Sequence, residues 1–137
     1  MMTTPQENKA LVKRFYEAIE QKNFEALHGM CHEDFVFYNQ VDVPHPGVEG
    51  LIAAEKKNFD AFESFRFPIE AMVAEDDKVA AYMLFEGTRQ IGPCVGATPE
   101  GNNCRFSLLM LLTIKDGKIV EKRAHFDTGD IYRQLTA

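Results

Sequence analysis

The chain has 137 residues, a length typical of one domain, and we expect a single domain over residues 1–137. It is 45% hydrophobic and 26% charged, as soluble globular proteins usually are. Its 15 basic residues are outnumbered by 21 acidic ones, so the net charge is −6. This balance argues against binding to nucleic acid or to an anionic membrane surface, since clustered lysine and arginine hold both.

Membrane and secretion signals are not evident in the sequence. No apolar run approaches the roughly 18 residues of a transmembrane helix. The first residues lack the basic and apolar regions of a signal peptide. Three cysteines with no CxxC spacing leave one unpaired in any disulfide scheme. Reduced thiols in the cytoplasm are the simplest explanation, so we expect a cytoplasmic protein.

The first part of the chain reads as helical. Apolar side chains recur at helical spacing over residues 5–22, and Thr4 with Pro5 fits a cap and a first helical position. Asn23 is expected to cap a shorter helix over residues 24–30. A short β-rich segment at residues 35–38 then runs into a Pro-Gly loop.

The second part changes from helix to strands. Helical spacing returns over residues 48–62, where three- and four-residue steps join Leu51, Ile52, Glu55, Phe59 and Phe62. We expect the remaining elements to be strands at 66–74, 79–90, 104–114 and 118–126, with a last helical turn at 131–135. Lys115-Asp116-Gly117 is a strong hairpin signal. Helices followed by hairpin-joined strands predict an α+β fold with an antiparallel sheet.

Several short segments together resemble one family. They are residues 8–18 (NKALVKRFYEA), 23–27 (NFEAL), 34–36 (DFV), 47–51 (GVEGL), 96–101 (GATPEG), 116–121 (DGKIVE), 126–127 (FD) and 132–135 (YRQL). In order and spacing they resemble the SnoaL-like polyketide cyclase or ester cyclase family of the NTF2-like superfamily. The resemblance implies a cone in which N-terminal helices pack on a strongly curved antiparallel sheet around an apolar pocket, commonly as a homodimer.

The resemblance also implies a chemistry. In polyketide cyclases of this kind, an aspartate in the pocket takes a proton from a carbon next to carbonyl groups and promotes an aldol ring closure, without metal or cofactor. The matching position here is Asp127. The resemblance therefore implies a cofactor-independent cyclase or isomerase that acts on an apolar, carbonyl-bearing small molecule.

Strand alternation groups Asp127 with Arg123 and His125 on one face of residues 118–127. In the pocket, His125 and Arg123 would assist Asp127 as acid and cation. Alternation alone favours a solvent-facing surface for these three residues. The resemblance at Phe126-Asp127 favours the pocket instead.

The sequence departs from the family pattern at two positions. Arg123 stands where a tryptophan is usual four residues before the aspartate, and Tyr38 stands at a usual histidine position. These exchanges point to a different, more polar substrate site, or to a site that binds without turnover. The expected substrate contacts are Tyr16, Tyr38, Asn39, Phe35, Met83, Phe85 and Met110. A buried tyrosine with its hydroxyl at the rim of the core is the alternative for Tyr16.

The sequence also permits other functions. A non-catalytic protein that binds an apolar small molecule is the main alternative, and a structural dimer through the apolar strand at residues 108–112 is a third. Arg123 with Asp127 supplies only half of the Asp-Arg-Asp set of an epoxide hydrolase. No metal is expected, because His28 and His32 alone do not define a site. Cys94 has no evident base to make it a nucleophile.

Overall fold

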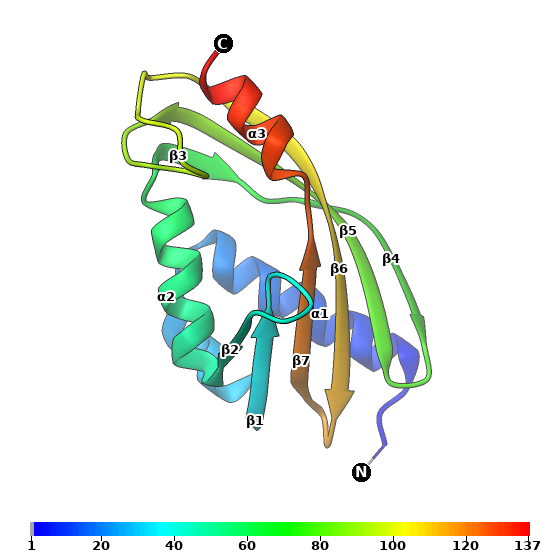
Figure 1. The fold of residues 1–137 in the computed structure, drawn as a ribbon. Helices are drawn as coiled ribbons and strands as arrows, with labels where there is room; N and C mark the ends of the chain where they lie inside the picture. The colour runs from blue at the N-terminus through cyan, green and yellow to red at the C-terminus, as the bar shows by residue number, and fades with distance from the viewer. Residues whose placement is uncertain (1) are drawn as a thin grey trace.

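The computed structural model describes residues 2–137 as helices packed on one strongly curved, open sheet (Figure 1). Its elements in chain order are α1 (Pro5–Glu20), the 3-10 helix η1 (Phe24–Gly29), β1 (Cys31–Tyr38), β2 (Pro44–Pro46), α2 (Gly47–Phe59), β3 (Phe62–Arg66), β4 (Ile69–Glu75), β5 (Lys78–Gln90), β6 (Cys104–Lys115), β7 (Lys118–His125) and α3 (Thr128–Leu135). The predicted α+β fold is confirmed.

Helix α1 begins as the sequence indicates. The Thr4 side chain accepts a hydrogen bond from the Glu7 backbone N–H at 3.1 Å, and the Glu7 carboxylate accepts one from the Thr4 N–H at 3.0 Å. This capping box satisfies two backbone donors that a helix start leaves without partners. Phe15 and Ile19 lie on the buried face of the helix. The apolar stripe therefore fixes which side of α1 packs on the sheet.

The sheet is antiparallel except at one pair. Its strand order is β2-β1-β7-β6-β5-β3, and β4 also pairs with β5. Strands β1 and β7 run parallel. No hairpin joins them, because α2 and five strands lie between them in the chain. Strand β2 forms in the segment that we expected to be a Pro-Gly loop, and it pairs with β1.

Strand β3 was not predicted either. Helix α2 ends at Phe59 rather than at residue 62, and residues 62–66 form β3. Phe59 and Phe62 are three residues apart, so their spacing fits a helical stripe as well as a helix followed by a strand. The Phe62 ring covers Gly87 of β5, where an added Cβ atom would lie 2.7 Å from the ring. Glycine at position 87 thus makes room for this aromatic ring.

The β6–β7 hairpin decides which side chains of β7 face inward. Asp116 and Gly117 at its turn both have positive φ angles, 53° and 75°. Such angles are typical of the type I′ turn of a two-residue hairpin. A register shift follows near Thr113 and Ile114. Beyond it, Lys122 and Ala124 are buried whereas His125 is exposed.

Phenylalanines form much of the core beneath the curved sheet. The Phe59 ring stacks on Phe65 with 4.3 Å between centroids, and the Phe85 ring lies 5.8 Å from Phe59 and 5.6 Å from Phe65. These three rings come from α2, β3 and β5. Aromatic stacking of this kind adds to the free energy of burying the rings. Within residues 2–137, no helix is long and apolar enough to cross a membrane.

Candidate functional site

An apolar cavity lies between α2 and the inner face of the sheet. It has a volume of about 80 Å³ and is lined by Phe37, Asn39, Ala54, Glu55, Asn58, Phe59, Phe62, Phe67, Phe85, Cys94, Val95, Phe106, Leu108, Met110, Lys122, Ala124, Phe126 and Ile131. Seven of the eleven phenylalanines in the chain are among them. By comparison, pockets for drug-sized ligands measure about 300–1,000 Å³. The cavity therefore fits a small apolar group or one end of a larger molecule.

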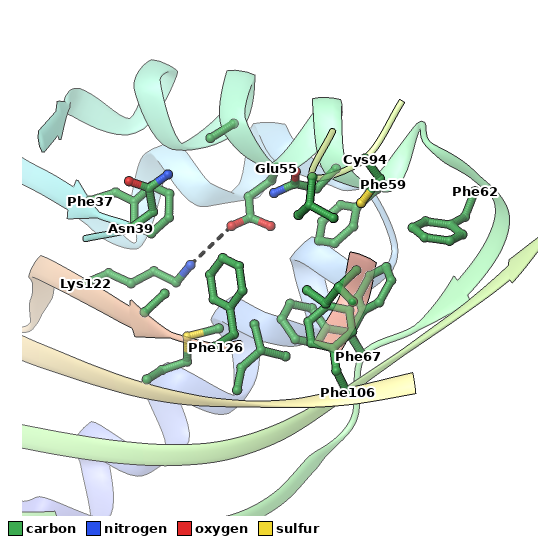
Figure 2. A pocket seen from close by; sticks show the side chains of 18 residues that line it. Phe37, Asn39, Glu55, Phe59, Phe62, Phe67, Cys94, Phe106, Lys122 and Phe126 are labelled. Atoms are coloured by element: carbon green, nitrogen blue, oxygen red, sulfur yellow. Dashed lines mark hydrogen bonds and ion pairs between the residues drawn. The ribbon is translucent and has the colours of Figure 1, made fainter. Parts of the chain in front are cut away.

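A buried ion pair lies in this aromatic cavity. Glu55 extends from α2 and Lys122 from β7, and the two side chains meet inside (Figure 2). The Lys122 Nζ atom donates a hydrogen bond to Glu55 Oε1 at 3.2 Å. The side chains are 1% and 8% exposed, respectively. Two opposite charges are thus held out of water beside apolar walls.

The surroundings of Lys122 are aromatic. Its Nζ atom lies 4.2 Å from the centre of the Phe37 ring and 5.7 Å from that of Tyr16. Contacts between a cation and the face of a ring are attractive, and more so away from water. An ammonium group has three N–H donors. Among the described residues, only Glu55 accepts a hydrogen bond from it.

Tyr16 completes the buried polar cluster next to the cavity. Its side chain is 1% exposed, and its hydroxyl has no hydrogen-bond partner within the described part of the chain. Burial, and secondarily the negative charge of Glu55, raises the pKa of Tyr16 well above its usual value. The hydroxyl therefore stays protonated at neutral pH and is able to donate a hydrogen bond.

The structure does not place the predicted catalytic residues in the cavity. Arg123, His125 and Asp127 are absent from its lining, whereas Lys122, Ala124 and Phe126 belong to it. The reason is the alternation of β7, which turns the even-numbered side chains inward. The expectation that the face bearing Arg123, His125 and Asp127 lines the apolar cavity is therefore corrected. The catalytic role of these residues stays a prediction.

Asp127 has a structural role at the end of β7. It caps α3, where its Oδ1 atom accepts a hydrogen bond from the Asp130 N–H at 3.2 Å. Its side chain is 72% exposed, and Oδ2 lies 3.9 Å from Arg133. A carboxylate is favourable at this position because it meets the unpaired N–H groups of the helix start. The Asp127 side chain is therefore surrounded by solvent and by the first turn of α3.

Arg123 and Tyr38 lie side by side outside the cavity. They are opposite each other in the β1–β7 register, and the Arg123 guanidinium lies 4.0 Å from the centre of the Tyr38 ring. The guanidinium also donates to Glu121 at 2.8 Å. The two residues that depart from the family pattern therefore contact each other, but on the outer face.

A surface groove adjoins the cavity and contains Asp127. Asn39, Phe106, Ala124 and Phe126 line both spaces. The groove measures about 690 Å³, and its other lining residues include His125, Asp127, Asp130 and Arg133. Phe126 is half-buried and its ring lies below the Glu55 carboxylate (Figure 2). A ligand too large for the cavity would extend past Phe126 into this polar groove.

Apart from Tyr38, which lies against Arg123 outside the cavity, the predicted substrate contacts divide into two groups. Asn39, Phe85 and Met110 line the cavity. Tyr16, Phe35 and Met83 are buried in the core but are not part of the lining. The Tyr16 ring does face the Nζ atom of Lys122, which lines the cavity.

Glu55 and Lys122 were not identified as site residues from the sequence, although each left a signal. Glu55 falls on the apolar stripe of its helix with Leu51 and Phe59, and all three are buried. Lys122 falls between Val120 and Ala124 on the apolar side of its strand. A charged residue at a position that periodicity places inside is rarely buried without a partner. Two such positions in one small domain indicate a buried pair.

The three cysteines are free thiols in the structure. Burial raises the pKa of Cys31 to about 12 and that of Cys104 to about 11. Burial also raises the pKa of Cys94, which lines the cavity. Raised values keep a thiol protonated, and the thiolate is the nucleophilic form. These side chains therefore act as small apolar groups.

Comparison with known proteins assigns the family. The model of the SnoaL-like polyketide cyclase family matches residues 10–135. The chain belongs to this family. The match spans nearly all of the described structure, including both halves of the Glu55–Lys122 pair. Membership supports a role of the cyclase or isomerase type. No protein of curated function matches the sequence.

Solved structures support the same fold. A candidate SnoaL-like polyketide cyclase from Jannaschia sp. CCS1 superposes with a TM-score of 0.88 at 22% identity, covering 100% of this chain and 98% of that one. TsrD from Streptomyces laurentii gives 0.85 at 26% identity, with 97% of each chain covered. An NTF2-like protein from Burkholderia xenovorans LB400 gives 0.74 at 19%, covering 96% and 98%. This SnoaL-like chain thus has the NTF2-like fold.

Proposed function

We propose that this SnoaL-like chain is a cofactor-independent cyclase or isomerase of an apolar, carbonyl-bearing small molecule, and that Glu55 and Lys122 carry the reaction. The observation behind the proposal is the buried pair itself, a carboxylate and an ammonium group 3.2 Å apart in a cavity lined by phenylalanine rings. Removing a carbon-bound proton next to a carbonyl needs a base and a donor for the enolate oxygen. The pair supplies both.

In the proposed reaction, a Glu55 oxygen takes the proton from the carbon next to the carbonyl. The electron pair of that C–H bond moves into the enolate, whose oxygen accepts a hydrogen bond from Lys122. In an aldol closure, the enolate carbon then attacks a second carbonyl carbon of the same molecule and forms a C–C bond. The second carbonyl oxygen takes the proton from Glu55. General acid–base catalysis of such a proton transfer raises the reaction rate about 10²–10⁴-fold in enzymes.

The energetics of burial support a functional pair. Moving two charges out of water costs several kcal/mol for each ion, and their attraction offsets this only when the geometry is good. Apolar side chains of similar size would often stabilise the fold as well or better. Lys122 has a single hydrogen-bond acceptor among residues 2–137. A pair of charges thus stabilises this core no more than apolar residues would. A catalytic role in the reaction explains why both charged residues are present.

Asp127 is a second candidate for the base. The family resemblance at Phe126-Asp127 favours it. So does the groove, because Asn39 and Phe126 line both the groove and the cavity. In this version the substrate lies in the groove with its apolar end behind Phe126, and His125 and Arg123 assist. The exposed side chain and the cap of α3 make Asp127 the weaker candidate.

Deuterium exchange separates the two candidates without knowledge of the natural substrate. Cyclohexanone is incubated with the protein in D₂O, and loss of the proton signal next to the carbonyl is followed by NMR. We expect the wild-type protein to accelerate exchange, Glu55→Gln to lower the acceleration at least ~100-fold, and Asp127→Asn to retain it. Glu49→Gln is the matched control, since Glu49 lies on the same helix and is 77% exposed.

Two results would contradict this assignment. Loss of exchange in Asp127→Asn, with activity retained in Glu55→Gln, would move the base to the groove. Cyclohexanone that binds in the cavity without any accelerated exchange would instead support the non-catalytic binding protein. Saturation-transfer NMR measures binding in the same samples, so the two failures are distinguishable.

We also propose that the chain forms a homodimer through the outer face of the sheet. Exposed apolar side chains at Val73, Tyr82, Leu109 and Leu111 support this. Tyr82 and Leu109 are opposite each other in the β5–β6 register, so they share one face. Size-exclusion chromatography with light scattering tests the proposal, and a Leu109→Glu variant is expected to be monomeric. A monomeric wild-type protein would contradict it.

A further inference from the structure

We propose that the Lys122 amine is also a nucleophile, which forms a covalent imine with small apolar aldehydes and ketones that enter the cavity. The class of ligand is a carbonyl compound with few polar atoms, and a compact 1,3-diketone is its best representative. The inference shares one premise with the proposed function, namely that the cavity admits such compounds. It assigns a different chemical event to the site, because a bond to protein is made.

The position of Lys122 distinguishes it from the other lysines. Its side chain is 1% exposed, and it lines the cavity. Lys78 and Lys22, by comparison, have half-exposed side chains paired with carboxylates on the surface. A carbonyl compound that is held among the phenylalanines lies next to Lys122 and away from every other lysine of the described chain. Such confinement raises the effective concentration of amine and carbonyl.

The pair also supplies a route to the reactive amine. Only the uncharged amine has the electron pair that attacks a carbonyl, and burial in an apolar pocket is a known way to activate lysine. Glu55 Oε1 lies 3.2 Å from Nζ and is in position to take one ammonium proton. The transfer replaces two buried charges by two neutral groups and so relieves the desolvation cost of the pair. The proton then stays at the site on Glu55.

The steps balance without an added reactant. The amine nitrogen attacks the carbonyl carbon and forms a C–N bond, while the carbonyl oxygen takes the proton from Glu55. The resulting hydroxyl leaves as water, with a proton from the nitrogen, and a C=N bond forms. This C=N bond is that of an iminium ion, whose nitrogen keeps one hydrogen. With a 1,3-diketone, Glu55 then takes a proton from the carbon between the two carbonyl positions, and the electron pair of that C–H bond forms a C=C bond while the C=N bond becomes C–N. The product is a conjugated enaminone, and the sum is amine plus diketone giving enaminone plus water.

Pentane-2,4-dione is the probe that tests this assignment. The whole protein is incubated with it near pH 8. We expect one adduct per chain, with the mass of the diketone less one water, and a new near-ultraviolet absorption band. Peptide mapping should place the adduct on Lys122.

Variants sharpen the result. Lys122→Arg keeps a cation beside Glu55 but has no amine that forms the enaminone, so the adduct should disappear. Glu55→Gln should slow adduct formation ~10-fold or more, because an amide does not take the proton. Lys118→Met, on the same strand, is the control and should react like the wild-type protein. If a variant fails to fold, as shown by circular dichroism, the peptide map of the wild-type protein still decides the matter.

An adduct spread over surface lysines, with Lys122 unmodified, would overturn the inference. So would an adduct rate unchanged in a folded Lys122→Arg protein. An adduct at Lys122 in a protein that shows no deuterium exchange with cyclohexanone would contradict the proposed reaction but uphold the nucleophile. Exchange without an adduct would do the reverse, so the two proposals fail separately.

Discussion

Glu55 on α2 and Lys122 on β7 form an ion pair with 3.2 Å between Oε1 and Nζ, and neither side chain is more than 8% exposed. The pair joins a helix to the middle of the sheet across an apolar cavity. Breaking it from one side leaves a charge buried without its partner. We therefore expect Lys122→Met to lower the free energy of unfolding by about 3–5 kcal/mol.

The double variant Glu55→Leu/Lys122→Met tests the same pair from the other side. It removes both charges and retains apolar bulk, so it should be more stable than Lys122→Met alone. Urea denaturation followed by circular dichroism measures all three proteins. A single variant within ~0.5 kcal/mol of wild type, the range of a surface substitution, would show that the pair is not buried in solution.

Replacing Tyr16, unlike replacing Lys122, is expected not to lower the free energy of unfolding. Its buried hydroxyl has no partner among the described residues, and an unmet buried donor costs about 1–3 kcal/mol. Tyr16→Phe is therefore expected to be as stable as wild type, or up to ~1 kcal/mol more stable. Urea denaturation at pH 7 measures this. A marked loss of stability would reveal an ordered water or another partner at the hydroxyl.

Alkaline pH gives Tyr16 a second signature. Its pKa is raised in the folded protein, first by burial and then by Glu55. The unfolded chain releases this proton near pH ~10, whereas the folded chain retains it. The stabilising contribution is thus complete below pH ~10 and is lost as the pH rises further. Between pH 9 and 11, Tyr16→Phe should lose less stability than wild type, and equal losses would argue against a buried phenol.

The contact between Gly87 and Phe62 should couple the effects of their substitutions on stability. A Cβ at position 87 would lie 2.7 Å from the Phe62 ring, which is too close for carbon atoms. Gly87→Ala should cost about 1–3 kcal/mol through overpacking. In a Phe62→Ala background the obstacle is gone, so the cost of Gly87→Ala should largely vanish. A double-mutant cycle by thermal denaturation measures the coupling, and strictly additive effects would contradict the contact.

Two substitutions of Asp127 test its structural role as the cap of α3. Its carboxylate caps α3, so Asp127→Ala should lower the free energy of unfolding by about 0.5–2 kcal/mol. Asparagine caps nearly as well, so Asp127→Asn should match wild-type stability. Thermal melts of the two variants give the comparison. Equal stability of all three proteins would show that the cap contributes little.

Much of the fold could be predicted from local signals. The Thr4 cap, the apolar stripe of α1 and the Asp116-Gly117 turn each carry their geometry in a few neighbouring residues. Strand β3 and the parallel β1–β7 pair could not be predicted in this way. Their positions depend on contacts between residues far apart in the chain, such as Phe62 with Gln90 and Cys31 with Ile119.

The site shows the same limit. Alternation along β7 correctly separated the two faces of the strand, but it does not say which face turns toward the helices. The resemblance directed attention to Asp127, whose side chain is 72% exposed. Lys122, one of the residues that line the cavity, was passed over although it interrupts an apolar face. The partner that explains it, Glu55, lies 67 positions away in the chain.

A crystal structure of the protein with phenol bound tests the central claim most directly. Phenol is a planar, apolar analogue of an enol, small enough for the apolar cavity. We expect its ring among the phenylalanines and its oxygen within hydrogen-bond distance of Lys122 Nζ, beside Glu55. Phenol bound in the outer groove against Asp127, with the cavity left unfilled, would contradict it.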